Sequence, residues 1–145
     1  MSEYIVKIIP KSEIHVPELA ERSNIINLIR TLGTTLDISE DILNDITFVD
    51  QGSNFESIMC DKCDMELEID WWSEQMKHCQ RGNFEDLSIT TPCCRKRSSL
   101  NNLEYIWTAG FARYVISIRN PEEEVVREIE RSMNQQKYKV IRAHY

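Results

Sequence analysis

Glycine and proline are scarce in this chain of 145 residues, which has only four of each. The sequence has no glycine-rich loop of the kind that cradles phosphates, and it has no H-E-x-x-H motif. A Ser-His-Asp pattern is missing as well. These absences weigh against an enzyme, and we expect a non-catalytic protein.

Long apolar runs are also missing, because nothing approaches the 18 or so uninterrupted apolar residues of a membrane helix. The opening segment MSEYIVKIIPK lacks the basic region and the small-residue cleavage site of a signal peptide. We therefore expect a cytoplasmic protein with no membrane partner. A reducing compartment disfavours structural disulfides, and the five cysteines cannot all pair within one chain.

Positive charge is in deficit, with 17 Lys and Arg against 24 Asp and Glu and a formal net charge of −7. Nucleic acid is bound mainly by clustered Lys and Arg, so this balance argues against a general affinity for it. The same balance fits a soluble protein, and it equally fits an acidic protein that binds a basic protein partner.

The pattern of apolar residues predicts one α+β domain over residues 1–145, and the 41% hydrophobic content supports a real core. We expect strands over residues 4–9, 54–60, 111–118 and 138–145, and helices over residues 17–32 and 121–133. Outside residues 60–110 the order is strand, helix, strand, strand, helix, strand. That order suits a ferredoxin-like, split βαβ sheet with two helices on one face. Residues 55–100 would then form an inserted zinc-ribbon-like subdomain.

Three further segments carry local signals. Residues 36–46, LDISEDILNDI, predict a short helix capped by Ser39. Residues 64–70, DMELEID, alternate strictly and predict a half-buried strand, followed by a helix over residues 71–80 that Asp70 would cap. The Asn120-Pro121 pair, followed by three glutamates, predicts a helix start with the Asn side chain as its cap.

Two cysteine pairs carry the main functional signal, CDKC at residues 60–63 and TPCC at residues 91–94. Zinc prefers tetrahedral sulfur and nitrogen ligands, and a C-x-x-C at a hairpin tip presents two thiolates to one ion. The second pair is adjacent, so both of its thiols reach one ion only if the backbone turns there, which Pro92 favours. We expect structural Zn²⁺ with four ligands, namely Cys60, Cys63, Cys93 and Cys94.

Other uses of these thiols stay open. Free cysteine behaves like a small hydrophobe, and Cys79, on a helix face with Trp72 and Met76, fits that role better than a ligand role. His78 is the reserve ligand if the adjacent pair supplies only one thiolate. A redox use of the C-x-x-C motif is less favoured, because Asp61 and Asp64 disfavour a thiolate unless a cation is bound.

Two surface features point to partners. Arg95, Lys96 and Arg97 follow the second cysteine pair and make a locally positive segment that could contact nucleic acid. In so acidic a protein we favour a solvated turn, or cations that balance the metal-bound thiolates. The aromatic segment LEYIWTAGFARY is typical of core and domain-junction residues. Trp and Arg are also enriched in interaction hot spots, so Trp107 and Arg113 are the candidate interface residues.

At CDKC, TPCC, LNNLEYIWTAGFARY, RNP and AHY, the chain resembles an uncharacterised family of small bacterial cytoplasmic proteins with a zinc-ribbon-like core. The resemblance covers residues 55–145. The family pattern reads C-P-x-C, P-C-C-G and W-P-x-G-F-A-R, and here the first proline is missing, Arg95 replaces the glycine and Thr108 replaces the second proline. The resemblance implies that the four paired cysteines hold a metal, and it lends no activity.

These observations favour a non-catalytic zinc-binding protein that acts through protein–protein interaction, for example as a regulatory or immunity-like module. A nucleic-acid-associated zinc-ribbon protein is the second hypothesis, and a thiol oxidoreductase is the third.

Overall fold

The protein is described by a computed structural model, which covers residues 2–33, 35–133 and 137–145. Its helices are α1 (Leu19–Thr31), α2 (Ile69–Gln80) and α3 (Glu123–Ser132). Its strands are β1 (Tyr4–Pro10), β2 (Asp37–Val49), β3 (Ser57–Met59), β4 (Ser88–Thr90), β5 (Arg97–Ser99), β6 (Glu104–Ile106), β7 (Gly110–Arg119) and β8 (Tyr138–His144). The predicted α+β class is confirmed.

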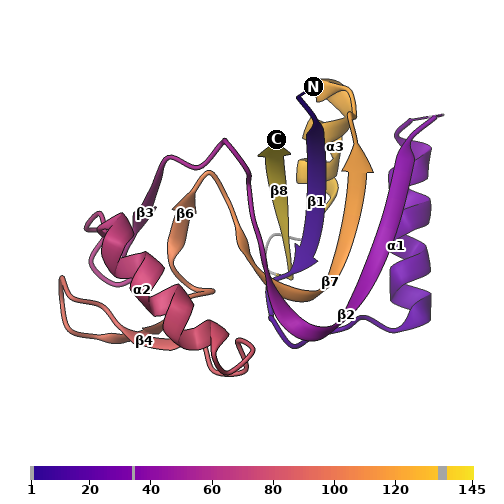
Figure 1. The fold of residues 1–145 in the computed structure, drawn as a ribbon. Helices are drawn as coiled ribbons and strands as arrows, with labels where there is room; N and C mark the ends of the chain where they lie inside the picture. Colours follow the sequence, from indigo (N-terminus) through magenta and orange to yellow (C-terminus); the bar gives the residue numbers. More distant parts are fainter. Residues whose placement is uncertain (1, 34, 134–136) are drawn as a thin grey trace.

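The largest sheet has four strands in the order β2-β7-β1-β8, and every neighbouring pair is antiparallel (Figure 1). Ile8 of β1 sits at the centre of this sheet, paired with Ile116 on one side and Val140 on the other. The central strand β7 is apolar over most of its length because side chains from both of its faces are buried.

One face of this sheet is covered by α1 and α3. Both helices contribute to one buried cluster, which also contains alternate residues of β7. The shared members of this cluster are Ile25 and Ile29 from α1, Val125 and Ile129 from α3, and Tyr114, Ile116 and Ile118 from β7. The helix predicted over residues 121–133 is thus confirmed as α3. Its apolar residues at helical spacing are all buried, namely Val125, Val126, Ile129 and Met133.

Residues 50–109 form a second region beside the sheet, with α2 and the short pairs β3–β6 and β4–β5 (Figure 1). This region has its own buried cluster, to which Ile58, Leu67, Cys79, Leu100 and Tyr105 belong. Ile46 and Phe111 of the sheet join the same cluster, so the two regions share a continuous core where β2 ends and β7 begins.

The helix predicted over residues 36–46 is wrong, because this segment is the first part of β2. Nine residues of β2 pair with β7, and this ladder outweighs the weak local helical signal of a segment rich in Asp and Asn. The strand expected over residues 54–60 shrinks to β3, which pairs with β6 outside the main sheet.

The half-buried strand predicted over residues 64–70 is also wrong. Leu67 is 4% exposed but Met65 is 59% exposed, so the alternation does not bury one side. The segment instead folds back on β3, where Leu67 N–H donates to the carbonyl of Ile58 at 2.8 Å. Helix α2 then begins at Ile69 after Glu68, so Asp70 lies in its first turn and is not its cap.

Asn120 does not cap a helix either. Its backbone has φ of 47°, and its side-chain oxygen accepts a hydrogen bond from Tyr4 N–H at 3.1 Å. Helix α3 begins later, at Glu123, with Glu122 at the capping position and no side-chain cap. The Asn side chain is used to tie the end of β7 to the start of β1.

Candidate metal centre

The first cysteine turn closes where β3 ends. Cys60 N–H donates to the carbonyl of Met65 at 2.8 Å, and Asp64 N–H donates back to the carbonyl of Cys60 at 3.0 Å. Asp64 adopts φ of 61°, the left-handed conformation that Asp tolerates better than most residues. The tight turn brings Cys63 back to the same side as Cys60.

The second turn, between β4 and β5, repeats this pattern. Thr91 N–H donates to the carbonyl of Lys96 at 3.0 Å, Arg95 N–H donates to the carbonyl of Thr91 at 2.9 Å, and Arg95 has φ of 56°. In this correspondence Thr91 takes the place of Cys60, and Cys94 takes the place of Cys63. Cys93 therefore corresponds to Lys62, two residues after the position of the missing first ligand, and the bend of the turn lets both adjacent thiols face inward.

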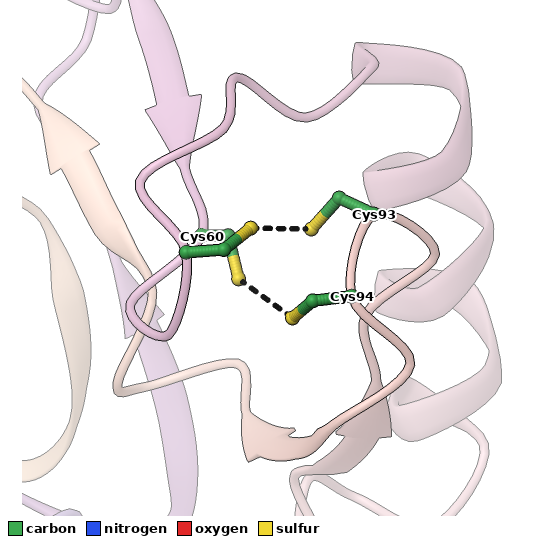
Figure 2. A group of neighbouring side chains, drawn as sticks. Cys60, Cys93 and Cys94 are labelled. Atoms are coloured by element: carbon green, nitrogen blue, oxygen red, sulfur yellow. Dashed lines mark hydrogen bonds between the residues drawn. The ribbon is translucent and has the colours of Figure 1, made fainter.

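The two turns bring four thiols together. The sulfur atoms of Cys60, Cys63, Cys93 and Cys94 all lie within 4.8 Å of one another. Figure 2 shows Cys93 and Cys94 reaching from the second turn toward Cys60. The Sγ–Sγ distances are 3.2 Å for Cys63–Cys93 and 3.9 Å for Cys60–Cys94. Zn–S bonds of about 2.3 Å put the corners of a tetrahedral site about 3.8 Å apart, so these spacings fit one ion.

All five cysteines are free thiols, and the four in the cluster differ in exposure. Cys60 is 0% exposed and Cys94 is half-buried, whereas Cys63 and Cys93 are exposed. The cluster thus has a buried side, Cys60 with Cys94, and a solvent side, Cys63 with Cys93. Each side takes one thiol from each turn.

Hydrogen bonds around Cys60 favour its thiolate. Burial acts to raise the pKa of Cys60, but the backbone N–H groups of Lys62 and Cys63 and the neighbouring Cys93 and Thr91 outweigh burial and lower this pKa to about 6. For Cys63 the Met65 N–H acts to lower the pKa, yet the surrounding thiols and desolvation outweigh it and raise the pKa. These hydrogen bonds favour a thiolate at Cys60, and metal binding requires the other thiols of the cluster to lose their protons as well.

Polar residues support the turns from outside the thiol group. Ser98 Oγ donates to Asp61 Oδ1 at 2.7 Å, which links the first turn to β5. The hydroxyl of the buried Thr91 lies 3.2 Å from Cys94 Sγ. Neither Thr91 nor Ser98 was predicted from the sequence, although aligning T-P-C-C with C-D-K-C would have marked Thr91 as the residue equivalent to Cys60.

The two reserve residues lie elsewhere. Cys79 is buried in the core of the second region, with a pKa raised by desolvation and by Asp86, so its predicted role as a small apolar residue fits. His78 is exposed on α2. Within residues 2–33, 35–133 and 137–145, neither residue belongs to the group that could hold a metal.

The partner candidates are exposed to different degrees. Arg95, Lys96 and Arg97 are all exposed beside the second turn. Trp107 is 41% exposed, and its indole N–H donates to Glu56 Oε1 at 3.0 Å. Arg113 lies on β7, half-buried, with its Nε donating to the carbonyl of Leu43 at 3.2 Å. The Arg113 side chain is therefore already hydrogen-bonded to the sheet, so Trp107 is the more accessible of the two interface candidates.

The helices of the described part of the chain are all too short or too polar to cross a membrane. No protein-family model matches the sequence, and comparison with curated proteins and with solved structures finds no match for the chain.

Proposed function

We propose that this protein binds one Zn²⁺ ion through Cys60, Cys63, Cys93 and Cys94, and that the ion is structural. The observation that carries the proposal is the convergence of four sulfur atoms within 4.8 Å from two separate turns. A set of four thiolates in a tetrahedral arrangement is typical of zinc or iron–sulfur chemistry. Because four protein ligands leave no open position, such a zinc ion is structural and does not activate water.

The second region has short strands, and we propose that the ion stabilises them. Strands β3, β4, β5 and β6 have three residues each, and isolated two-stranded ribbons are marginally stable in water. Structural zinc contributes about 10–16 kcal/mol of apparent binding free energy in small peptides at neutral pH. We infer that residues 55–100 are an inserted zinc-ribbon-like subdomain whose two cysteine turns are held by the metal.

The sheet that carries this insertion is proposed to be a ferredoxin-like, split βαβ sheet. The order β2-β7-β1-β8, with all pairs antiparallel, supports this, since β7 lies between β1 and β2, the two strands that α1 connects. Packing of α1 and α3 into one cluster adds support.

Metal analysis of the purified protein tests the zinc proposal. We expect one zinc per chain by elemental analysis, and four thiols that react with Ellman's reagent only after chelation. Cys60→Ser and Cys94→Ser are expected to lose the metal, whereas Cys79→Ala, which changes the free thiol of the core, keeps it. Protein without stoichiometric zinc, or equal metal loss in Cys79→Ala, contradicts the proposal. If the purified protein instead contains iron and absorbs visible light, the four cysteines hold an iron–sulfur site and not zinc.

For biological role we favour a non-catalytic, cytoplasmic protein that binds another protein, of a regulatory or immunity-like kind. The net charge of −7 and the exposed Trp107 support a partner with a basic surface and a pocket for an aromatic side chain. Affinity capture with the wild-type chain, with Trp107→Ala and with Lys77→Ala as a matched surface control tests this role. A partner lost only with Trp107→Ala supports it, and the repeated recovery of no partner contradicts it.

Nucleic acid is the second candidate partner, favoured by the exposure of Arg95, Lys96 and Arg97 beside the metal turn. Three phosphate contacts give a log–log salt slope of about −2.7. Replacing all three residues by Ser should abolish that slope, and binding that survives the replacement removes this mechanism. A thiol oxidoreductase, the third hypothesis, requires a reactive cysteine in the metal-loaded protein, so slow alkylation before chelation excludes it.

A further inference from the structure

A cavity lies apart from the cysteine cluster, between the 103–109 segment, which contains β6, and the α3–β8 side of the sheet. It consists of two adjoining hollows of about 370 Å³ and about 500 Å³. The two hollows form one groove because they share five lining residues, Glu104, Tyr105, Thr108, Glu130 and Val140. Volumes of this size suit a small organic ligand.

Two lysines line one end of this groove. Lys139 Nζ donates to the backbone oxygen of Asn101 at 3.0 Å and to its side-chain oxygen at 3.2 Å. In the described ranges, no carboxylate lies within ion-pair distance of Lys139 or Lys11. A partly buried ammonium group held only by neutral oxygens is a site that an anion would stabilise.

The acidic groups of the groove do not compensate these lysines. Glu130, which lines both hollows, is already paired with Arg142 at 2.6 Å. Glu104 is exposed at the rim. Arg142 is bound by Glu123 at 2.8 Å as well as by Glu130, so it adds no free positive charge. At the other end of the lining Lys11 and Lys139 face Glu104, which leaves one positive charge there and fits a monoanion better than a dianion.

The rest of the lining is apolar or aromatic. Leu103, Tyr105 and Met133 lie along the lysine end, and Val140 and Trp107 continue the surface toward Arg142. Trp107 is 41% exposed and lines this hollow, so its indole ring is accessible to a flat ligand. The positive charge at one end of the groove therefore favours an anionic group on the ligand, and the apolar surface along the groove favours a ring.

We propose that this groove binds a small aromatic carboxylate, with its carboxylate between Lys139 and Lys11 and its ring against Tyr105, Val140 and Trp107. The site does not use the cysteines and is independent of the proposed metal function. Desolvation and the nearby Lys11 lower the pKa of Lys139 to about 8, whereas Glu13, which faces the same Asn101 amide, acts to raise this pKa. This balance supports a bound anion that favours the charged amine.

The experiment titrates 2-naphthoate into the full, metal-loaded chain at pH 7 and follows amide chemical shifts and tryptophan fluorescence. We expect saturable binding, with shifts confined to residues around 103–109 and 139–142. The uncharged analogue 2-naphthalenemethanol should bind about tenfold or more weakly, which corresponds to a loss of one charge-assisted contact. Inorganic phosphate, an anion without a ring, should bind more weakly than 2-naphthoate.

Variants separate the site from general affinity for aromatic anions. Lys139→Met should weaken 2-naphthoate about tenfold or more, Lys139→Arg should retain most of the affinity, and Lys77→Met, on exposed α2, should match the wild type. Thermal unfolding of each variant verifies that it is folded. Equal affinity in Lys139→Met and Lys77→Met, equal affinity for the alcohol, or the absence of saturable binding by the wild type overturns the proposal.

Discussion

The side-chain oxygen of Asn101 accepts a hydrogen bond from the backbone N–H of Phe111 at 2.9 Å, and so joins the loop after β5 to the start of β7. The amide of the same residue donates to the carbonyl of Lys11 at 2.9 Å and to Glu13 Oε2 at 3.1 Å. Asn101 is 3% exposed, so these bonds are made without competition from water. One buried amide thus connects the cysteine-bearing region to β7 and to the segment that follows β1.

Replacing Asn101 by Ala should destabilise the protein by about 2–4 kcal/mol, because the backbone N–H of Phe111 and the carbonyl of Lys11 lose their partner and Lys139 loses one of its two acceptors. Urea unfolding measures the change. Asn102→Ala is the matched control, since Asn102 is exposed and should change stability by less than about 0.5 kcal/mol. Similar losses at the two positions would show that Asn101 is not a connecting residue.

Gly52→Ala should be strongly destabilising, by about 2 kcal/mol or more. Gly52 has φ of 60°, and an added Cβ would lie 2.0 Å from the carbonyl oxygen of His144, which pairs with this segment. Gly82→Ala provides the comparison, because its Cβ would meet nothing closer than 3.8 Å. Thermal unfolding of both variants should separate them clearly, and equal melting temperatures would contradict the packing argument.

Lys139→Met should stabilise the folded chain at pH 7, by about 1–2 kcal/mol. Desolvation lowers the pKa of Lys139 from 10.5 to about 8, so the charged amine opposes folding below pH 8. Between about pH 8 and pH 10.5 the unfolded state binds more protons, and wild-type stability should rise with pH. The advantage of Lys139→Met should therefore shrink toward pH 10, and urea unfolding at pH 7 and pH 10 measures it. A difference that does not change with pH would contradict this account.

Metal removal should loosen one region and spare the other. After chelation we expect amide protons of β3, β6 and α2 to lose protection against hydrogen exchange, because pairs of three-residue strands depend on the metal. Amides of β1 and β7, in the middle of the four-stranded sheet, should stay protected. Uniform loss of protection across the chain would mean that the two regions unfold as one unit.

Part of this structure could be predicted from the sequence. The α+β class follows from clear periodicity in residues 111–133, and the approach of four thiols follows from the spacing of CDKC and TPCC. The cysteine turns are local structures, in which donors and acceptors lie within six residues, so sequence reasoning reaches them.

The remaining features depend on contacts between distant residues. Residues 36–46 form a strand only because β7, some seventy residues later, offers a ladder to pair with. The sequence predicts Asn120 as a helix cap, yet its side-chain oxygen accepts a hydrogen bond from the backbone N–H of Tyr4, which is distant in sequence. Lys139 shows no signal in the sequence, because its environment is created by Asn101 and the 103–109 segment.

The pairing of Val49 with Gly110 means that the chain leaves the sheet and returns to it at directly opposed positions. In topological terms, everything from residue 50 to residue 109 is one greatly extended hairpin connection. The entropy of closing a loop grows only slowly with its length, so such a connection can be lengthened, shortened or exchanged at little thermodynamic expense. The main obstacle to removing residues 50–109 is the apolar surface of Ile46 and Phe111. A shortened chain would have to cover this surface with other side chains or expose it to water.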